Sequence, residues 1–342
     1  MNSTVTRPRR ASALGPGLVV LGAALALVAF LSITLGSRSI GLPEVLRALG
    51  GLGDGDAISS TVTLELRVPR TLLGILVGAA LGVAGAVLQG VTRNPLADTG
   101  IMGINSGAAA FVVLAVTVLG VRGVGVYVWF AFAGAIVATL LVYAIASMGR
   151  EGATPLKLAL AGAAVTAGMG SLTTGIVMTN VDALQELRFW QVGSLAGRYA
   201  PILLGVAPFL LLGLVAALAC GRVLNGLALG EDMARGLGQR VGLTRVAAFA
   251  IVAVLAGAAT AACGPIVFVG LVVPHLARFV CGPDYRWILP YSMLLSPIVL
   301  LLADVVGRVV AAPGELQVGV VLGVLGAPVF IGIVRYGRLS EA

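Results

Sequence analysis

The sequence predicts an all-α polytopic membrane protein, and three observations support this fold class. Hydrophobic residues make up 59% of the 342 residues and charged residues only 11%, whereas a soluble domain carries about 25% charged residues. Long apolar runs recur along the chain, each close to the roughly 20 residues that a helix needs to cross a bilayer. The 48 glycines are about twice the usual share and follow no collagen-like period, which favours closely packed helices. An ordinary soluble enzyme and a disordered chain are therefore excluded.

Ten apolar runs bounded by charged or turn residues predict ten transmembrane helices. In chain order they cover residues 17–35, 71–91, 106–121, 126–148, 156–178, 201–220, 246–262, 264–281, 287–303 and 316–334. Ten spans of about 20 residues use most of the chain, so we expect residues 1–342 to form a single transmembrane domain. The apolar run of the first span is longer than the roughly 7–15 residues of a cleaved signal peptide, which favours a retained helix.

Lysine and arginine indicate the orientation of these spans. With the N-terminus inside, fourteen of the 22 basic residues fall on the cytoplasmic side and eight on the outside. The positive-inside tendency favours this arrangement, which predicts a multi-pass protein of the cytoplasmic membrane with both termini in the cytoplasm. The net charge of +8 then belongs to the cytoplasmic face, and we expect no nucleic-acid partner.

The second predicted span carries small residues at every fourth position. These residues are Gly74, Gly78, Gly82, Ala86 and Gly90. At 3.6 residues per turn they form one face on which a neighbouring helix can lie close. We therefore expect the second span to be central in the bundle. Gly319, Gly323 and Ala327 repeat the pattern in the last span.

Several kinds of chemistry are missing from the sequence. Lys157 is the only lysine and is followed by Leu158, so the chain contains no Walker A motif for binding ATP. His275 is the only histidine, and the three cysteines are isolated, which argues against multi-histidine, CxxC and other metal sites. We expect no catalytic residue, no metal site and no cofactor bound by this chain.

The acidic residues bear on the class of transporter. None lies near the centre of a predicted span, although Asp304 is close to a span end. An ion-coupled carrier usually keeps an ionisable group within the membrane, so this class is disfavoured. A carrier that coordinates sodium through backbone carbonyls needs no such ionisable group. The ion-coupled secondary transporter therefore stays an alternative function.

Two polar segments resemble contact sites for partner proteins. Residues 222–245 form the longest charged cytoplasmic connection, and Gly230–Gly238 within it has acidic residues in a first helical turn and a glycine near the end. Apolar residues among these charges favour a short helix that faces a partner over a solvated loop. Arg67, Arg70 and Arg308 lie outside, against the positive-inside tendency. They are either snorkelling interfacial residues or the contact for a carboxylate-bearing extracytoplasmic partner.

A series of ordered motifs resembles one known family. The motifs are Arg67–Thr71, Gly78–Gly82, Gln89, Arg93–Asp98, Gly103–Gly107, Gly264–Gly270, Pro274–His275, Leu302–Arg308, Pro313–Leu316 and Gly326–Val329. From about residue 35 to the C-terminus the chain resembles the FecCD family of ABC-importer permeases, which includes the vitamin B12 permease. Within this family, Leu187–Gln191 followed by Gly193–Leu195 is most similar to the FepD-type subunit of ferric-enterobactin permeases.

The resemblance implies a fold and a set of partners. It implies the type II ABC importer permease fold, with ten helices in one permease domain and a central path between two permease subunits. The FepD-like features favour a heterodimer with a paralogue over a homodimer. Two ATP-binding subunits, which would hold ATP and Mg²⁺, are expected on the cytoplasmic side. An extracytoplasmic substrate-binding protein and the lipid of a bacterial inner membrane complete the partners.

The resemblance also assigns roles to particular residues. Arg67, Arg70 and Arg308 match the arginines that meet glutamates of the substrate-binding protein. Asn94 and Leu96 match a cytoplasmic gate, and Thr154 matches a second gate, at which Pro155 stands where some relatives carry serine. The residues that match the ATPase-coupling segment are Gly230, Glu231, Asp232, Ala234, Arg235, Leu237 and Gly238.

The expected function is the permease subunit of an ATP-driven ferric-siderophore importer, with ATP hydrolysed by the partner subunits. The nearest alternative is the same kind of importer carrying vitamin B12 or haem.

Overall fold

The computed structural model describes residues 11–38, 40–51, 57–121, 123–148 and 153–336, and within this part the chain is built from helices. The helices are α1 (Ala11–Thr34), α2 (Leu42–Leu49), α3 (Ala57–Thr61), the π-helical turn η1 (Val62–Arg67), α4 (Val68–Thr92), the 3₁₀ turn η2 (Thr99–Met102), α5 (Ile104–Leu119), α6 (Val124–Ala146), α7 (Pro155–Val177), α8 (Val181–Gln191), α9 (Ala200–Ala219), α10 (Gly221–Ala228), α11 (Glu231–Gly236), α12 (Val241–Cys263), α13 (Val269–Cys281), α14 (Tyr285–Val310) and α15 (Val318–Tyr336).

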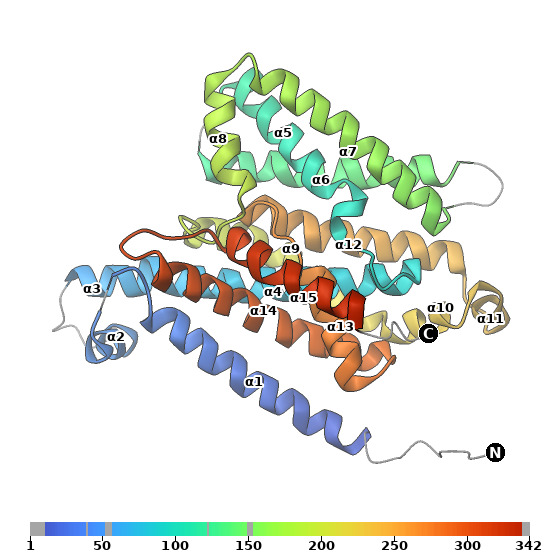
Figure 1. Cartoon of the computed structure of the whole chain (residues 1–342), viewed down its shortest axis with the longest axis horizontal. Helices are drawn as coiled ribbons and strands as arrows, with labels where there is room; N and C mark the ends of the chain where they lie inside the picture. The colour runs from blue at the N-terminus through green and yellow to red at the C-terminus, as the bar shows by residue number, and fades with distance from the viewer. Residues whose placement is uncertain (1–10, 39, 52–56, 122, 149–152, 337–342) are drawn as a thin grey trace.

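The bundle is elongated, and most long helices run along its length (Figure 1). α2 and α3 lie at one end, here named the α2 end, and α10 and α11 lie at the other, named the α11 end. α1 follows one edge of the bundle and α5 to α8 form the opposite edge, with α4, α13, α14 and α15 between them. The predicted outer residues therefore gather at the α2 end and the predicted cytoplasmic segment 222–245 lies at the α11 end.

Each predicted apolar run coincides with a helix. Seven helices of the described part are long and apolar enough to cross a membrane, and α5, α13 and part of α15 are shorter apolar helices at the other three predicted positions. The chain is therefore a helical, multi-pass membrane protein. The number of ten spans stays a prediction, as does the side on which the termini lie, because both termini fall outside the described residues.

Several boundaries differ from the predicted ones where proline or glycine governs the backbone. The predicted span 264–281 begins only at Val269, because residues 264–268 form an irregular connection after α12 ends at Cys263. The predicted span 287–303 extends to Tyr285–Val310 and accommodates Pro290 and Pro297 within one helix. The second span is preceded without a break by α3 and η1, so the helix that contains it runs from Ala57 to Thr92.

α4 is the central helix, as the four-residue spacing of small residues predicts. Nearly all of its residues from Leu73 to Val91 are buried, and it packs on α14, α12, α13 and α9. A side-chain carbon at Gly78 would lie 2.6 Å from the Cα of Pro297 in α14, and one at Gly82 would overlap Ser296. The face of small residues therefore allows the backbone of α14 to pack directly against that of α4. In the last span, by contrast, a side-chain carbon at Gly319 would overlap the Val192 carbonyl, whereas Gly323 faces open space.

Four short helices lie in segments for which the sequence predicts connections and no helix. These helices are α2, α3, α8 and α10, and each is too short to span a membrane. They therefore lack the long apolar run by which a transmembrane helix is predicted. α8 has a local signal, because the Asn180 side chain accepts a hydrogen bond from the Ala183 N–H at 2.9 Å and caps its first turn. Its buried residues Ala183, Leu187 and Trp190 repeat at helical spacing.

Candidate functional site

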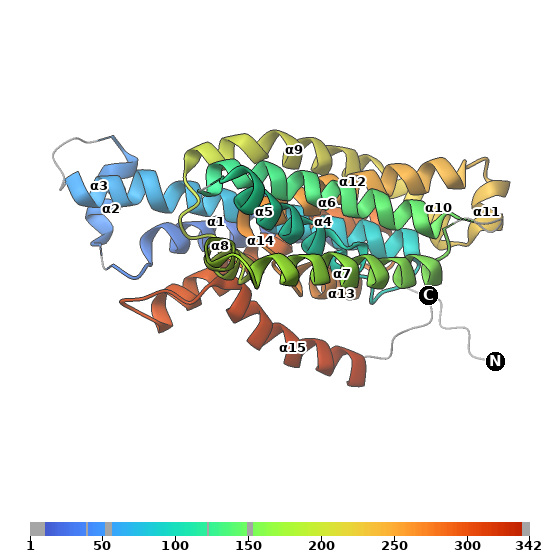
Figure 2. The same ribbon diagram turned by 90° about the horizontal axis from the view of Figure 1, so that it is seen from above.

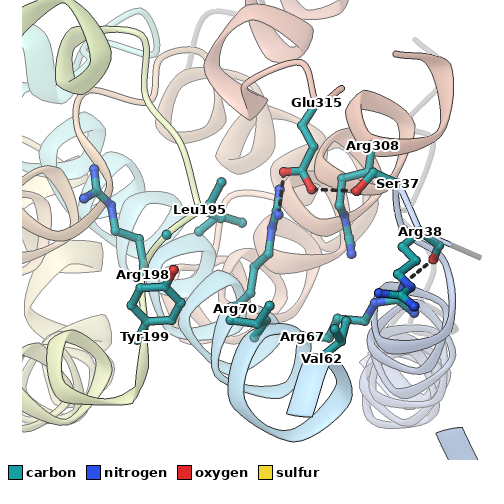
Figure 3. Close-up of a pocket in the computed structure, with 14 residues that line it drawn as sticks. Ser37, Arg38, Val62, Arg67, Arg70, Leu195, Arg198, Tyr199, Arg308 and Glu315 are labelled. Carbon is teal, nitrogen blue, oxygen red and sulfur yellow. Dashed lines mark hydrogen bonds and ion pairs between the residues drawn. The ribbon is translucent and has the colours of Figure 1, made fainter. Parts of the chain in front are cut away.

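A pocket of about 280 Å³ opens at the α2 end, and arginines dominate its charged lining (Figure 3). Its walls come from the α1–α2 connection, η1, the start of α4, the α8–α9 connection and the residues around the end of α14. The arginines that line it are Arg38, Arg67, Arg70, Arg198 and Arg308, and Glu315 is the one carboxylate among its described lining residues. The three arginines singled out by the sequence thus share one pocket.

Arg70 is held by two carboxylates at the rim of this pocket. Its Nε and Nη2 donate to the two oxygens of Asp304 at 3.1 and 2.8 Å, and its Nη1 donates to Glu315 at 2.7 Å. Asp304 is completely buried and also forms an ion pair with Arg308 Nη2 at 3.1 Å. Burial alone would raise the pKa of Glu315, but the charge of Arg70 and hydrogen bonds from Arg70 and Ser37 outweigh it and lower that pKa. Glu315 is therefore ionised at neutral pH in this arrangement.

Arg67 and Arg308 are bound to the C-terminal end of α1. Arg67 Nη1 donates to the carbonyls of Ile33 and Thr34 at 3.0 and 2.8 Å, and its Nη2 donates to the Arg38 carbonyl. Arg308 Nη1 donates to the carbonyls of Ser32 and Leu35 at 3.0 and 2.9 Å. The last carbonyls of a helix have no partner within the helix and carry partial negative charge, so two guanidinium groups satisfy and stabilise this end.

These contacts change what the outer arginines can offer a partner. Arg67 and Arg308 are 5% and 2% exposed, so they act on a partner mainly through their charge and not through open surface. Arg38 is exposed, and the buried Arg198 keeps its Nε without a hydrogen-bond partner among the described residues. Arg38 and Arg198 were not predicted as contact residues, because no spacing in the sequence links them to Arg67 and Arg70.

The predicted coupling segment contains a short helix, α11, which projects from the α11 end (Figure 1). Gly230, with a φ of 109°, allows the chain to turn into α11, and Ala234 is buried against the bundle. Glu231 and Asp232 both pair with Arg235, and Glu231 also pairs with Arg245 of α12. The segment is thereby fixed to the membrane helix that follows it.

Three apolar side chains on this segment face away from the bundle. Leu229, Met233 and Leu237 are each at least 60% exposed. The apolar residues Leu227, Leu229, Met233 and Leu237 among the charges predict a partner-facing helix, but Leu227 differs from the other three because it is buried. The structure places a helix there with the other three side chains uncovered, which is the arrangement that docking into a partner's groove requires.

The predicted gate residues occupy connections near this end. Asn94 is exposed and its side chain accepts from the Leu96 N–H at 2.9 Å, just after Arg93 ends α4 with a φ of 49°. A side-chain carbon at Gly230 would lie 3.8 Å from Arg93 Nη1, so the connection that carries Asn94 and Leu96 adjoins the start of the coupling helix. Thr154 caps α7, accepting from the Lys157 N–H at 3.3 Å.

The sequence of residues 24–336 matches that of the FecCD transport family. The chain belongs to the FecCD transport family. It is 44% identical to the ferric enterobactin transport system permease protein FepD of Escherichia coli K12, over 94% of each chain. It is 45% identical to the probable siderophore transport system permease protein YfiZ of Bacillus subtilis, over 80% of this chain and 82% of the relative.

Further matches show the range of the FecCD family and its fold. The cobalamin import system permease protein BtuC of Halobacterium salinarum is 40% identical over 79% of this chain and 72% of its own. A solved structure described as an inward-facing conformation of a putative metal-chelate type ABC transporter superposes with a TM-score of 0.80. It shares 28% identity and covers 94% of this chain and 99% of its own. The predicted importer-permease fold is confirmed by this match.

Proposed function

We propose that this FecCD chain is the permease subunit of an ATP-driven importer. In this proposal it moves a ferric siderophore from an extracytoplasmic binding protein across the bacterial cytoplasmic membrane. The observation that carries the proposal is the placement of two contact sites at opposite ends of one helical bundle. An arginine-lined pocket lies at the α2 end, and an apolar projecting helix lies at the α11 end. The two siderophore permeases among the relatives support the choice of substrate.

The pocket at the α2 end suits acidic side chains of a binding protein. Five arginines line it, and Asp304 and Glu315 neutralise only part of their charge. An excess of positive charge attracts carboxylates and accelerates encounter. Arg67, Arg70 and Arg308 supply the field in this proposal, and the exposed Arg38 offers a guanidinium that a carboxylate can reach.

The helix at the α11 end suits the ATP-binding subunits. The chain has no Walker A motif of its own, so we place ATP and Mg²⁺ on two partner subunits and no cofactor on this chain. The adjacency of Gly230 and Arg93 supports a direct connection from the coupling helix to Asn94 and Leu96. Movement of α11 by the ATPase would then reach the gate through one contact.

The remaining partner is a second permease subunit, which we propose to be a paralogue. α15 is apolar and packs on few neighbours, and Val324, Leu325 and Ile331 are more than half exposed. α7, α8, α13 and α15 lie on the same side of the molecule, opposite α9 (Figure 2). We place the second subunit on that side, with the transport path between the two chains, a single permease domain in each and both termini in the cytoplasm.

The substrate is tested by uptake into vesicles that contain the complete transporter and its binding protein. We expect ATP-driven accumulation of a radioiron-labelled ferric siderophore. Uptake of labelled cobalamin or haem in place of every iron chelate would favour the alternative substrates, of which cobalamin is represented among the relatives.

Docking of the binding protein is tested at the arginine pocket. We expect Arg38→Glu to weaken the affinity for the binding protein by about tenfold at low salt. Arg47→Glu is the matched control, because Arg47 is an exposed arginine of α2 outside the pocket.

The coupling assignment is tested on α11. Met233→Asp combined with Leu237→Asp should lower the affinity for the ATPase subunits by at least about thirtyfold, because the loss of even one buried apolar anchor costs about 2 kcal/mol at an interface. The measurement is the amount of ATPase that co-purifies with the tagged permease. These residues are better targets than Glu231, whose replacement would also release Arg245.

Leu46→Asp combined with Leu49→Asp is the control, since both are exposed apolar residues of a short helix at the opposite end. Equal recovery of the ATPase with both double variants would contradict the assignment of α11.

A further inference from the structure

A second pocket, of about 430 Å³, lies between α5, α7, α8 and the α12–α13 connection. Its volume falls within the roughly 300–1,000 Å³ of small-molecule sites. Polar residues from α5, α7 and α8 line it, among them Asn105, Thr166, Thr174, Arg188 and Gln191, and the α12–α13 connection contributes Pro265. It is separate from the arginine pocket at the α2 end, because the two share no lining residue.

The polar groups of this pocket include donors that have no acceptor among the described residues. Asn105 accepts from Thr260 Oγ1 at 3.2 Å through its side-chain oxygen, which leaves its amide N–H groups free to donate. Thr166, Thr174 and Gln191 are exposed. Thr173 and Ser106 differ, because their hydroxyls already donate to the carbonyls of Met169 and Gly103 at 2.8 and 3.0 Å. Asn105, Thr166, Thr174 and Gln191 can therefore donate hydrogen bonds to a ligand, whereas Thr173 and Ser106 only form part of the pocket wall.

The position of these groups indicates what the pocket faces. α7 is an apolar helix of transmembrane length, yet only 22% of its most apolar window is buried. A hydroxyl that faces lipid can bond only back to its own helix, as Thr173 does, so the free hydroxyls of Thr166 and Thr174 favour a position against water or protein. That side of the molecule also carries α8, α13 and α15 (Figure 2), which is the side we assign to the second subunit and the path.

The charge of the pocket selects among ligands. Arg188 of α8 is the only ionisable residue among the described lining residues, and it is exposed. An unpaired guanidinium beside amide and hydroxyl donors suits a ligand with several oxygen acceptors and negative charge. A cationic ligand would find no carboxylate in this wall.

We propose that this pocket is a binding station for an anionic, oxygen-rich iron chelate within the transport path, and that Arg188 gives it a preference for anionic over neutral chelates. The inference rests on the proposed function, because it assumes that the path carries iron chelates. The second subunit closes the open side, and Arg188 is a specificity residue that touches the chelate. The free donors of Asn105, Thr166, Thr174 and Gln191 bind its oxygens whatever its charge.

The test measures equilibrium binding to the complete transporter in lipid nanodiscs without ATP and without the binding protein. The two probes are a radioiron-labelled ferric tris-catecholate, which is a trianion, and a neutral ferric tris-hydroxamate. Arg188→Gln should weaken binding of the trianion by about tenfold and leave the neutral chelate within about twofold, because only the charge–charge attraction is removed. Arg188→Lys should restore most of the lost affinity for the trianion.

Two further variants separate the roles of the lining residues. Thr174→Val should weaken both chelates by a similar factor, since it removes a hydroxyl donor and keeps the shape. Arg47→Gln, which changes an exposed arginine outside both pockets, should change neither affinity.

Unchanged trianion binding in Arg188→Gln, or an equal loss for both chelates, would overturn the inference while leaving the importer assignment intact. A wild-type complex that hydrolyses ATP but neither binds nor accumulates any iron chelate would contradict the proposed function itself. The two failures are therefore distinguishable.

Discussion

Asp304→Asn is expected to destabilise the protein by about 3–5 kcal/mol, the cost of breaking a buried ion pair by removing one partner. Asp304 is completely buried, accepts two hydrogen bonds from Arg70 and forms an ion pair with Arg308. Asparagine keeps the shape but leaves these two guanidinium groups with less negative charge to offset their desolvation. The measurement is the thermal unfolding midpoint of the purified transporter, together with the fraction that elutes as a folded complex.

Glu315→Gln is the matched control for this prediction. Glu315 bonds to the same Arg70, but its side chain is 32% exposed, so water replaces the lost contact and the expected cost is at most about 1 kcal/mol. Asp304→Asn combined with Arg308→Met should lose less than the sum of the single variants, because the methionine removes one of the stranded charges. Equal midpoints for Asp304→Asn and the unmodified protein would contradict the structural role assigned to this carboxylate.

Gly85→Ala is expected to have the second large effect, about 3 kcal/mol or more, at the upper end of overpacking costs. An added methyl group at this position of α4 would overlap the backbone carbonyl of Gly270 in α13. Backbone atoms cannot rotate away as a side chain can, so α4 and α13 would have to move apart along their contact. We expect loss of folded protein from the membrane fraction, measured by the yield of monodisperse complex and by its unfolding midpoint.

Gly168→Ala and Gly175→Ala provide the comparison for this substitution. Both positions lie in α7 with open space around them, and alanine favours a helix over glycine by about 1 kcal/mol. These variants should be as stable as the unmodified protein or slightly more stable. A folded, fully stable Gly85→Ala protein would show that α4 and α13 do not pack as closely as described.

The sequence was sufficient for the helices because a bilayer imposes one strong rule. Every spanning segment must be apolar and about 20 residues long, so the apolar runs coincide with helices such as α6, α9 and α12. The four-residue spacing of small residues in α4 also indicated its central place, because such a face is useful only against a close neighbour. α2, α8 and α10 escaped prediction since helices this short are stabilised by packing more than by their own composition.

The functional residues divide in a similar way. The projecting α11 with its apolar face was predictable, because apolar residues within a charged segment are local information. The roles of Arg67 and Arg308 were not, since the carbonyls they bind belong to α1, more than 30 positions away in one case and more than 270 in the other. The pocket that contains Arg188 was also missed, because it joins α5, α7 and α8 with a connection near Pro265.

The sequence by itself determined that this FecCD chain is a helical membrane protein, where its apolar helices lie and which segments project from the bundle. These properties follow from the hydrophobic run length and from local turn and cap residues. Only the tertiary structure decided which arginines remain open to a partner and which cap a helix end. Hydrogen bonding and burial depend on which helices pack together, and the local sequence around a residue does not indicate which distant helix it contacts.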